Sequence, residues 1–254
     1  MVSRVLTAIA LIFVVVGALL SPSPWPFAAA MLLATGLCAY EATELVGSGK
    51  SPALPSALWT VAFVGTIWWI SKGATAIATL GVVSGLAIIG AMACWKQVRW
   101  FAGAYPAGAL AALAALQFQP HSGLPLALAV LVPIWAGDTF AMFAGRKFGK
   151  TPLAPKLSPK KTLEGAIANL IASVVASLAL GPYVGLPIPV ALAIGASAGI
   201  VGQGGDLFES FLKRRAGTKD SGSLLPGHGG VFDRIDALLP HAAVSYCILL
   251  LTLK

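Results

Sequence analysis

A polar block from Lys213 to Asp236 holds the residue types best suited to chemistry, and apolar segments flank it on both sides. Arginine and lysine bind phosphate, carboxylates bind hard divalent cations, and glycine lets the backbone approach a ligand. The block therefore predicts a site that handles a polyphosphate with a metal. Its charged residues are Lys213, Arg214, Arg215, Lys219, Asp220, Asp233, Arg234 and Asp236.

Carboxylates predict where the metal binds. Asp206 lies four residues before Ser210, so the two side chains share a helix face, with Glu209 beside them. Asp233 and Asp236 are three residues apart on the expected first turn of the last helix, so they face one side. Helix capping would explain Asp233 alone but not the set. Carboxylates from two helices suit Mg²⁺, which takes nucleotide phosphates as further ligands.

His228 lies between glycines in the sequence PGHGG and cannot be hidden in a helix core. It could donate to a phosphate or act as an acid-base catalyst. The chain has no HExxH, no Cys/His cluster and no GxxxxGK[ST]. Zinc hydrolase and P-loop functions therefore lack support.

Two upstream features add polar groups. Asp138 lies inside an apolar stretch, where an acid either bonds a neighbouring helix or lysine, or forms a polar wall of an active site. The segment LSPKKTLEG predicts a helix start, with Ser158 as the cap and Pro159 at the first helical position. Lys160 and Lys161 would then form an anion site, or would serve only as cytosolic topology signals. Glu164 in the same turn favours capping by its charge or a bond to an arginine.

The composition predicts an all-α polytopic membrane protein, because 57% of the residues are hydrophobic and 10% are charged. A span needs about 20 apolar residues. The first span also resembles a signal peptide, but a second apolar stretch follows it at once. We expect about nine transmembrane helices, at 4–20, 25–46, 56–71, 74–95, 99–118, 123–145, 162–182, 187–208 and 236–253.

The cations predict the orientation, since cytoplasmic loops are rich in Lys and Arg. With a cytosolic N-terminus and an outer C-terminus, all 17 Lys and Arg residues except Lys72 and Lys254 face the cytosol. The net charge of +8 is then a topology signal with an anion-binding face, which argues against a nucleic-acid partner.

The chain organises into three consecutive regions: N-terminal helices at 1–72, middle helices at 73–150, and C-terminal helices at 151–254 with a cytosolic catalytic block at 199–236. The part before about residue 120 has few polar residues beyond Glu41 and Glu44, and we interpret it as scaffold, lipid-facing surface or oligomer contact. Glycine pairs four residues apart predict close helix contacts. These pairs are Gly81 with Gly85 and Gly195 with Gly199.

These motifs resemble the phosphatidate cytidylyltransferase (CDP-diacylglycerol synthase) family. The segment from 135 to 240 carries the resemblance, including GDTFAMFAGRKFGKTPLAPKLSPKKTLEG, with Met142 where that family commonly has tyrosine. The downstream signature shows no departure from the family. Its residues are Ser210, Lys213, Arg214, Lys219, Asp220, Pro226, His228, Gly229, Gly230, Asp233, Arg234 and Asp236.

The resemblance implies that CTP and phosphatidic acid give CDP-diacylglycerol and pyrophosphate. It also implies nine helices, Mg²⁺ with room for a second cation, a bacterial inner membrane with a cytosolic site, and a chain able to form a homodimer. By the resemblance, the metal ligands would be Asp206, Asp233 and Asp236. The catalytic residues would be Asp206, Lys213, Arg214, Lys219, Asp220, His228 and Asp233. The substrate-binding residues would be Asp138, Arg146, Ser158, Lys160, Lys161, Glu164, Ser210, Gly229, Gly230 and Arg234.

Two other functions stay open. A CTP-dependent polyprenol kinase would use similar parts but transfer the terminal phosphate. A transporter or channel would explain the spans and Asp138, but not the carboxylates and glycines of the polar block.

Overall fold

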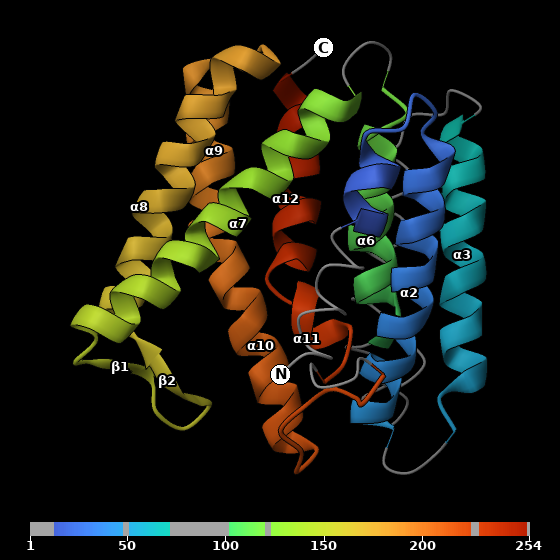
Figure 1. The fold of residues 1–254 in the computed structure, drawn as a ribbon. Coiled ribbons are helices and arrows are strands. Elements are labelled where there is room, and N and C mark those ends of the chain that lie inside the picture. Colours follow the sequence, from blue (N-terminus) through green and yellow to red (C-terminus); the bar gives the residue numbers. More distant parts are fainter. Residues whose placement is uncertain (1–12, 48–50, 72–101, 120–122, 225–228, 253–254) are drawn as a thin grey trace. The chain divides into compact units, whose positions relative to one another are not determined.

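The computed structural model describes residues 13–47, 51–71, 102–119, 123–224 and 229–252, and these are mostly helical (Figure 1). The chain divides into two compact units, each made of two separate stretches of sequence. Unit 1 is Met1–Leu124 with Arg215–Ile235, and unit 2 is Pro125–Arg214 with Asp236–Lys254. The sequence predicts a division into three consecutive regions, whereas these units are defined by contacts between residues. The three regions therefore stay a prediction.

Five described helices are long and apolar enough to cross a bilayer, which supports a helical membrane protein. Two shorter apolar helices are Ala104–Leu116 and Leu238–Thr252. The expected span at 74–95 and much of that at 4–20 lie outside the described residues, so the count of nine stays a prediction. The five long helices are Trp25–Val46, Ala53–Ser71, Gly123–Phe148, Leu163–Val184 and Ile188–Arg215.

Unit 1 is built on α2 (Trp25–Val46), α3 (Ala53–Ser71) and α6 (Ala104–Leu116), which pack against one another (Figure 1). Every described α6 side chain except that of Tyr105 is buried, because α6 is rich in alanine and small side chains let neighbouring helices come close. The short helix α11 (Phe232–Ile235) comes from late in the chain and contacts α2.

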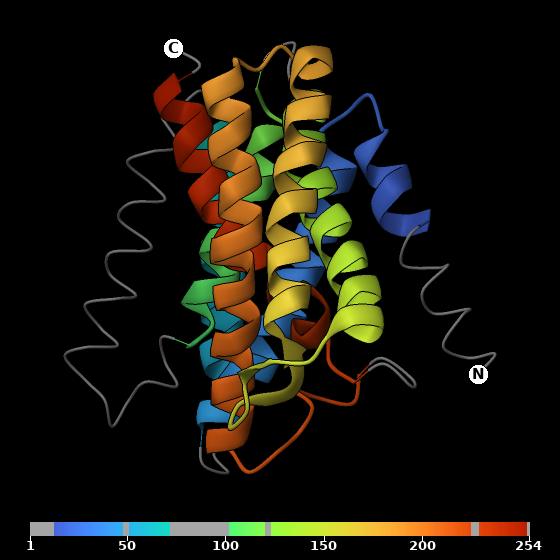
Figure 2. The ribbon, with the colours of Figure 1, turned by 90° about the vertical axis from the view of Figure 1, so that its left-hand side faces the viewer.

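Unit 2 contains most of α7, a hairpin and six further helical elements. Figure 2 shows α9, a π-helical turn η3 and α10 following one another as one long helix beside α8. The last helix, α12, packs against α9 and η3. The elements are α7 (Gly123–Phe148), β1 (Pro152–Ala154), β2 (Ser158–Thr162), α8 (Leu163–Leu180), η2 (Gly181–Val184), α9 (Ile188–Ser197), η3 (Ala198–Gly202), α10 (Gln203–Arg215) and α12 (Leu238–Thr252).

Glycines set the distance between α8 and the long helix. A Cβ at Gly195 would lie 2.7 Å from the Cα of Val174, and one at Gly199 would lie 2.6 Å from the Cα of Leu170. Either substitution would push the two backbones apart, so the close helix contact predicted for this pair is confirmed. The other predicted pair, Gly81 with Gly85, lies outside the described residues.

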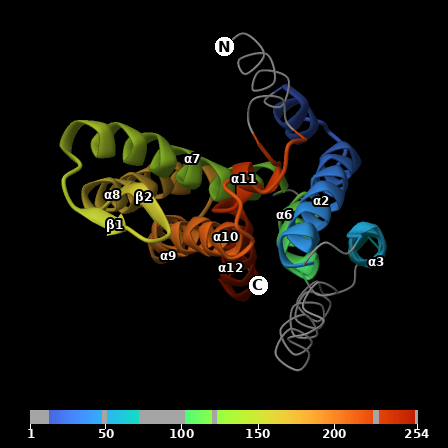
Figure 3. The ribbon, with the colours of Figure 1, turned by 90° about the horizontal axis from the view of Figure 1, so that it is seen from below.

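A β-hairpin occupies the segment where the sequence predicts a helix start. Figure 3 shows it between the C-terminal end of α7 and the N-terminal end of α8. The prediction that Ser158 caps a helix with Pro159 at its first position is wrong, because both belong to β2, which pairs antiparallel with β1. Proline is tolerated there because both strands of a two-stranded sheet are edges. Helix α8 begins at Leu163, and the cap is Thr162, whose Oγ1 accepts from the Gly165 N–H at 3.2 Å. The prediction of helices alone therefore missed this hairpin.

Candidate active site

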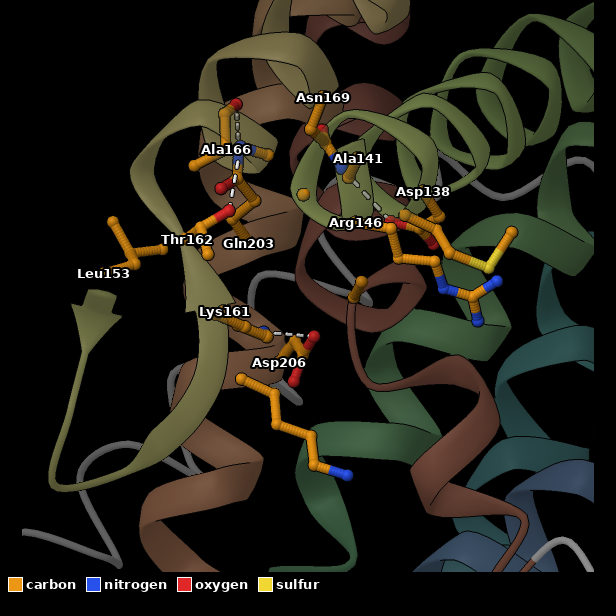
Figure 4. Close-up of a pocket in the computed structure, with 15 residues that line it drawn as sticks. Asp138, Ala141, Arg146, Leu153, Lys161, Thr162, Ala166, Asn169, Gln203 and Asp206 are labelled. Carbon is orange, nitrogen blue, oxygen red and sulfur yellow. Dashed lines mark hydrogen bonds and ion pairs between the residues drawn. The ribbon is translucent and has the colours of Figure 1, made fainter. Parts of the chain in front are cut away.

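A cavity of about 540 Å³ lies within unit 2, lined by the second half of α7, by β2, by the start of α8 and by α10 (Figure 4). This volume is in the range of small-molecule sites. Arg146, Lys160 and Lys161 bring positive charge to the cavity, and Asp138 and Asp206 bring negative charge. The cavity can therefore offer cations to a phosphate and carboxylates to a metal.

Asp138 lines this cavity from α7 and also bonds the neighbouring helix. Its Oδ1 accepts a hydrogen bond from Asn169 Nδ2 on α8 at 3.2 Å (Figure 4), and Ser173 Oγ donates to Asn169 Oδ1 at 3.4 Å. Gly137 permits this contact, because a Cβ there would lie 2.8 Å from Asn169 Oδ1. The two alternatives for Asp138, a helix-helix bond and a polar cavity wall, are thus both features of the structure.

Lys161 on β2 forms an ion pair with Asp206 on α10 (Figure 4). Gln203, one turn earlier on α10, donates from Nε2 to the backbone oxygens of Ala166 and Gly199. These bonds tie the hairpin, α8 and α10 together around the cavity. Lys160 and Lys161 both line it, although they project from a strand rather than from the predicted helix start.

Three carboxylates converge near this cavity. Each of Asp206, Glu209 and Asp236 offers an oxygen within 4.8 Å of the others. Lys213 Nζ lies 2.5 Å from Glu209 Oε2, one helical turn along α10. Burial, followed by the negative charges of Asp206 and Glu209, raises the pKa of Asp236 to about 9. Like charges held this close favour a bound cation or proton.

The donor set fits a hard divalent cation. Mg²⁺ takes oxygen ligands and is usually held by one or two carboxylates together with substrate phosphates. Asp206 belongs to both the carboxylate cluster and the cavity lining. A metal held there would lie beside the cations that line the cavity.

Asp233 and Asp236 do not share a helical turn, so that prediction is wrong. Asp233 lies on α11, which ends at Ile235, and α12 begins at Leu238. Asp233 belongs to unit 1, where its Oδ2 accepts from the backbone N–H groups of Ser221 and Gly230, both at 2.9 Å, and lies 3.0 Å from Ser221 Oγ.

The other predicted site residues are divided between the two units. In unit 2, Ser210 is buried on α10, and Arg214 Nε donates to the Leu157 oxygen at 3.3 Å. Glu164 lies in the first turn of α8 and accepts from the backbone N–H groups of Lys150 and Thr151, so of its two predicted alternatives the bond to an arginine is not found among the described residues. Lys219, Asp220 and Arg234 are exposed residues of unit 1, and Gly229 and Gly230 belong to the same unit. His228 lies outside the described residues.

Sequence reasoning missed three contributors. Glu209 joins the carboxylate cluster; the sequence placed it beside Asp206, but it was not assigned to the metal site. Asn169 orients Asp138 from another helix, and an amide within an apolar stretch was a weaker signal. Glu41, assigned to the scaffold, accepts hydrogen bonds from Val231 and Phe232. No local pattern links residues so far apart.

Comparison with known proteins identifies the family of this chain. Residues 2–252 match the sequence pattern of the cytidylyltransferase family. The chain belongs to this family. The phosphatidate cytidylyltransferase of Brucella abortus biovar 1 (strain 9-941) is 37% identical over 216 residues, which cover 82% of this chain and 78% of that protein. The phosphatidate cytidylyltransferase of Thermotoga maritima is 43% identical over 133 residues, which cover 50% of this chain and 49% of that protein.

A plant member is also similar. Phosphatidate cytidylyltransferase 4, chloroplastic, of Arabidopsis thaliana is 41% identical over 134 residues, which cover 52% of this chain and 34% of that protein. The family resemblance stated from the sequence motifs is therefore confirmed, and the chain is a nucleotidyltransferase of this family.

Proposed function

We propose that the chain transfers a cytidylyl group from CTP to phosphatidic acid, giving CDP-diacylglycerol and pyrophosphate. The observation that carries this function is a cavity lined by Arg146, Lys160 and Lys161 that shares Asp206 with a cluster of three carboxylates. Cations suit the lipid phosphate, and the carboxylates suit the metal that accompanies a nucleoside triphosphate. Family membership supports the same reaction.

In the proposed reaction, an oxygen of the lipid phosphate attacks the α-phosphorus of CTP. A new P–O bond forms, the bond between the α-phosphorus and its bridging oxygen breaks, and pyrophosphate leaves. The phosphate is already an anion, so the chain needs to position it and neutralise its charge more than to remove a proton. Arg146, Lys160 and Lys161 would bind the lipid phosphate.

The carboxylates Asp206, Glu209 and Asp236 would hold Mg²⁺, with Asp233 proposed as a further ligand from the family resemblance. When bound, the metal neutralises charge on the departing pyrophosphate. The resemblance further assigns Lys213, Arg214, Lys219 and His228 to phosphate contacts. These residues would bind and orient the triphosphate so that the leaving group lies opposite the attacking oxygen.

For the membrane arrangement we propose nine spans with the N-terminus in the cytosol, and a site that faces the cytosol of a bacterial inner membrane. The distribution of Lys and Arg along the chain supports this orientation. A cytosolic site gives CTP access from water and phosphatidic acid access from the adjoining leaflet. A homodimer stays a prediction.

The experiment uses purified protein in detergent with phosphatidic acid and CTP labelled at the α- or the γ-phosphate. Cytidylyl transfer places the α-label in the lipid, and the γ-label leaves as pyrophosphate. A lipid kinase gives the reverse pattern. Recovery of the γ-label in the lipid without α-label would reject the proposed function, and lipid without either label would reject both.

A further inference from the structure

Glu41 is a buried carboxylate at an unexpected place, on the mostly apolar helix α2. Its side chain is 1% exposed. Its Oε1 accepts from the Val231 N–H at 3.0 Å, and its Oε2 accepts from the Phe232 N–H at 2.8 Å. Ser221 Oγ lies 3.0 Å from the same Oε2. A carboxylate is costly to bury unless hydrogen bonds replace its water, and here both oxygens receive them.

The loop that surrounds Glu41 is shaped by glycines. A Cβ at Gly222 would lie 2.8 Å from Glu41 Oε1, and a Cβ at Gly230 would collide with both Glu41 and Ser221. Gly229 has a φ of 81°, in the left-handed region that favours glycine. The backbone at Gly222 and at Gly230 thus lies too close to the Glu41 carboxylate to leave room for a side chain at either position.

Ser221 connects Glu41 to Asp233. Its Oγ lies 3.0 Å from Glu41 Oε2 and 3.0 Å from Asp233 Oδ2, and its single hydroxyl hydrogen can donate to one of these oxygens at a time. Gly230 provides a second connection, because its N–H donates to Asp233 Oδ2 at 2.9 Å while its backbone packs against Glu41. All these residues belong to unit 1.

We propose that Glu41 is a positioning residue for cytidylyl transfer. Its hydrogen bonds fix Ser221, Val231 and Phe232, and thereby the Asp233 carboxylate. This inference rests on the proposed function, in which Asp233 acts at the metal. Glu41 does not touch the substrate in this role. It determines where Asp233 and its neighbours lie, so α2 has a role beyond that of a scaffold.

The central variant is Glu41→Gln. An amide keeps the volume but turns one oxygen into an NH₂ group, which would face the N–H of Val231 or Phe232 and leave a buried donor without an acceptor. We expect faster hydrogen-deuterium exchange over residues 229–236. Because a displacement of about 1 Å in an active site can reduce rates about 100-fold, we expect turnover to fall at least about tenfold.

A second readout separates positioning from simple loss of folded protein. If Glu41 places Asp233 at the metal, Glu41→Gln raises the Mg²⁺ concentration that gives half-maximal turnover. A smaller folded fraction would lower the rate without moving that concentration. The matched control is Glu44→Gln, which changes an exposed glutamate one turn later on the same helix and should leave exchange, rate and Mg²⁺ dependence as in the wild type.

Ser221→Ala keeps the test decisive if Glu41→Gln does not fold, since it removes one hydroxyl and retains both backbone bonds to Glu41. It should also raise the half-maximal Mg²⁺ concentration. An unchanged Mg²⁺ dependence in either folded variant overturns the proposal, as does unchanged exchange in Glu41→Gln. If the wild type makes no CDP-diacylglycerol, the proposed function fails, and with it the catalytic role of Glu41. The exchange data then still show whether Glu41 orders the loop.

Discussion

The ammonium of Lys161 on β2 forms an ion pair with the carboxylate of Asp206 on α10, and both residues line the same cavity. Asp206 is also one of three clustered carboxylates. A divalent cation at that cluster would therefore compete with Lys161 for Asp206. A lysine displaced from Asp206 would be free to bind a phosphate in the cavity.

Lys161→Ala should consequently bind a metal more tightly and turn over more slowly. Removing the ammonium takes away both a competitor and a repelling charge, but also a phosphate ligand. Titration with Mn²⁺ by electron paramagnetic resonance, without substrate, measures the first effect. Lys156→Ala, an exposed lysine of the same hairpin segment, is the control and should match the wild type. Weaker Mn²⁺ binding by Lys161→Ala would contradict this account.

The raised pKa of Asp236 predicts that metal binding depends on pH. Its pKa is raised to about 9, by burial first and then by Asp206 and Glu209, so without metal it holds a proton at neutral pH. That proton must leave before the carboxylate can bind a cation, so affinity for Mn²⁺ should rise as the pH increases toward 9. Asp236→Asn should flatten this dependence. A wild-type affinity that is constant over the same pH interval would refute the prediction.

Asp138→Asn separates the two features of Asp138. The amide oxygen can still accept from Asn169 Nδ2, so the bond between α7 and α8 survives while the negative charge is lost. We expect turnover to fall about tenfold or more with little change in the melting temperature. Asn169→Leu should instead lower the melting temperature, because it removes the bond between the helices. Full activity in Asp138→Asn would show that the charge serves no purpose in the reaction.

Cysteines introduced at exposed positions test the orientation of the chain in the membrane. Ser223 is exposed in the glycine-containing loop, and Tyr183 in η2 is 86% exposed. In a background without Cys38, Cys94 and Cys247, a membrane-impermeant maleimide should label Ser223→Cys only from the cytosolic side and Tyr183→Cys only from the outside. Labelling of both positions from the same side would be incompatible with the proposed topology.

Helix positions were predictable where apolar length alone decides them. The expected span at 25–46 coincides with α2, and the expected spans at 56–71 and 123–145 fall within α3 and α7. The hairpin was not predictable in the same way, because Ser158 and Pro159 before a helical segment match the pattern of a capped helix. The choice between strand and helix depends on pairing with β1, which no local pattern contains.

The sequence predicted the residue types of the site better than it predicted how those residues are arranged in space. Clustering of Asp206 with Asp236 agrees with the expected convergence of carboxylates, whereas the expected pairing of Asp233 and Asp236 on one turn failed. Pro240 carried a usable signal, since proline favours the first turn of a helix and α12 begins at Leu238. The bonds of Glu41 depend on tertiary structure and left no trace in the sequence.

The separation of Glu41 from its partners also has a consequence for synthesis of the chain. Its hydrogen-bonding partners Ser221, Val231 and Phe232 follow it by 180, 190 and 191 residues. At about 5–20 residues per second, α2 leaves the ribosome roughly 10–40 s before the loop that binds this carboxylate. During that interval, water or a temporary partner must solvate Glu41. Unit 1 can therefore complete its folding only near the end of translation, and a nascent chain interrupted before the loop would lack every protein partner that Glu41 has in the folded unit.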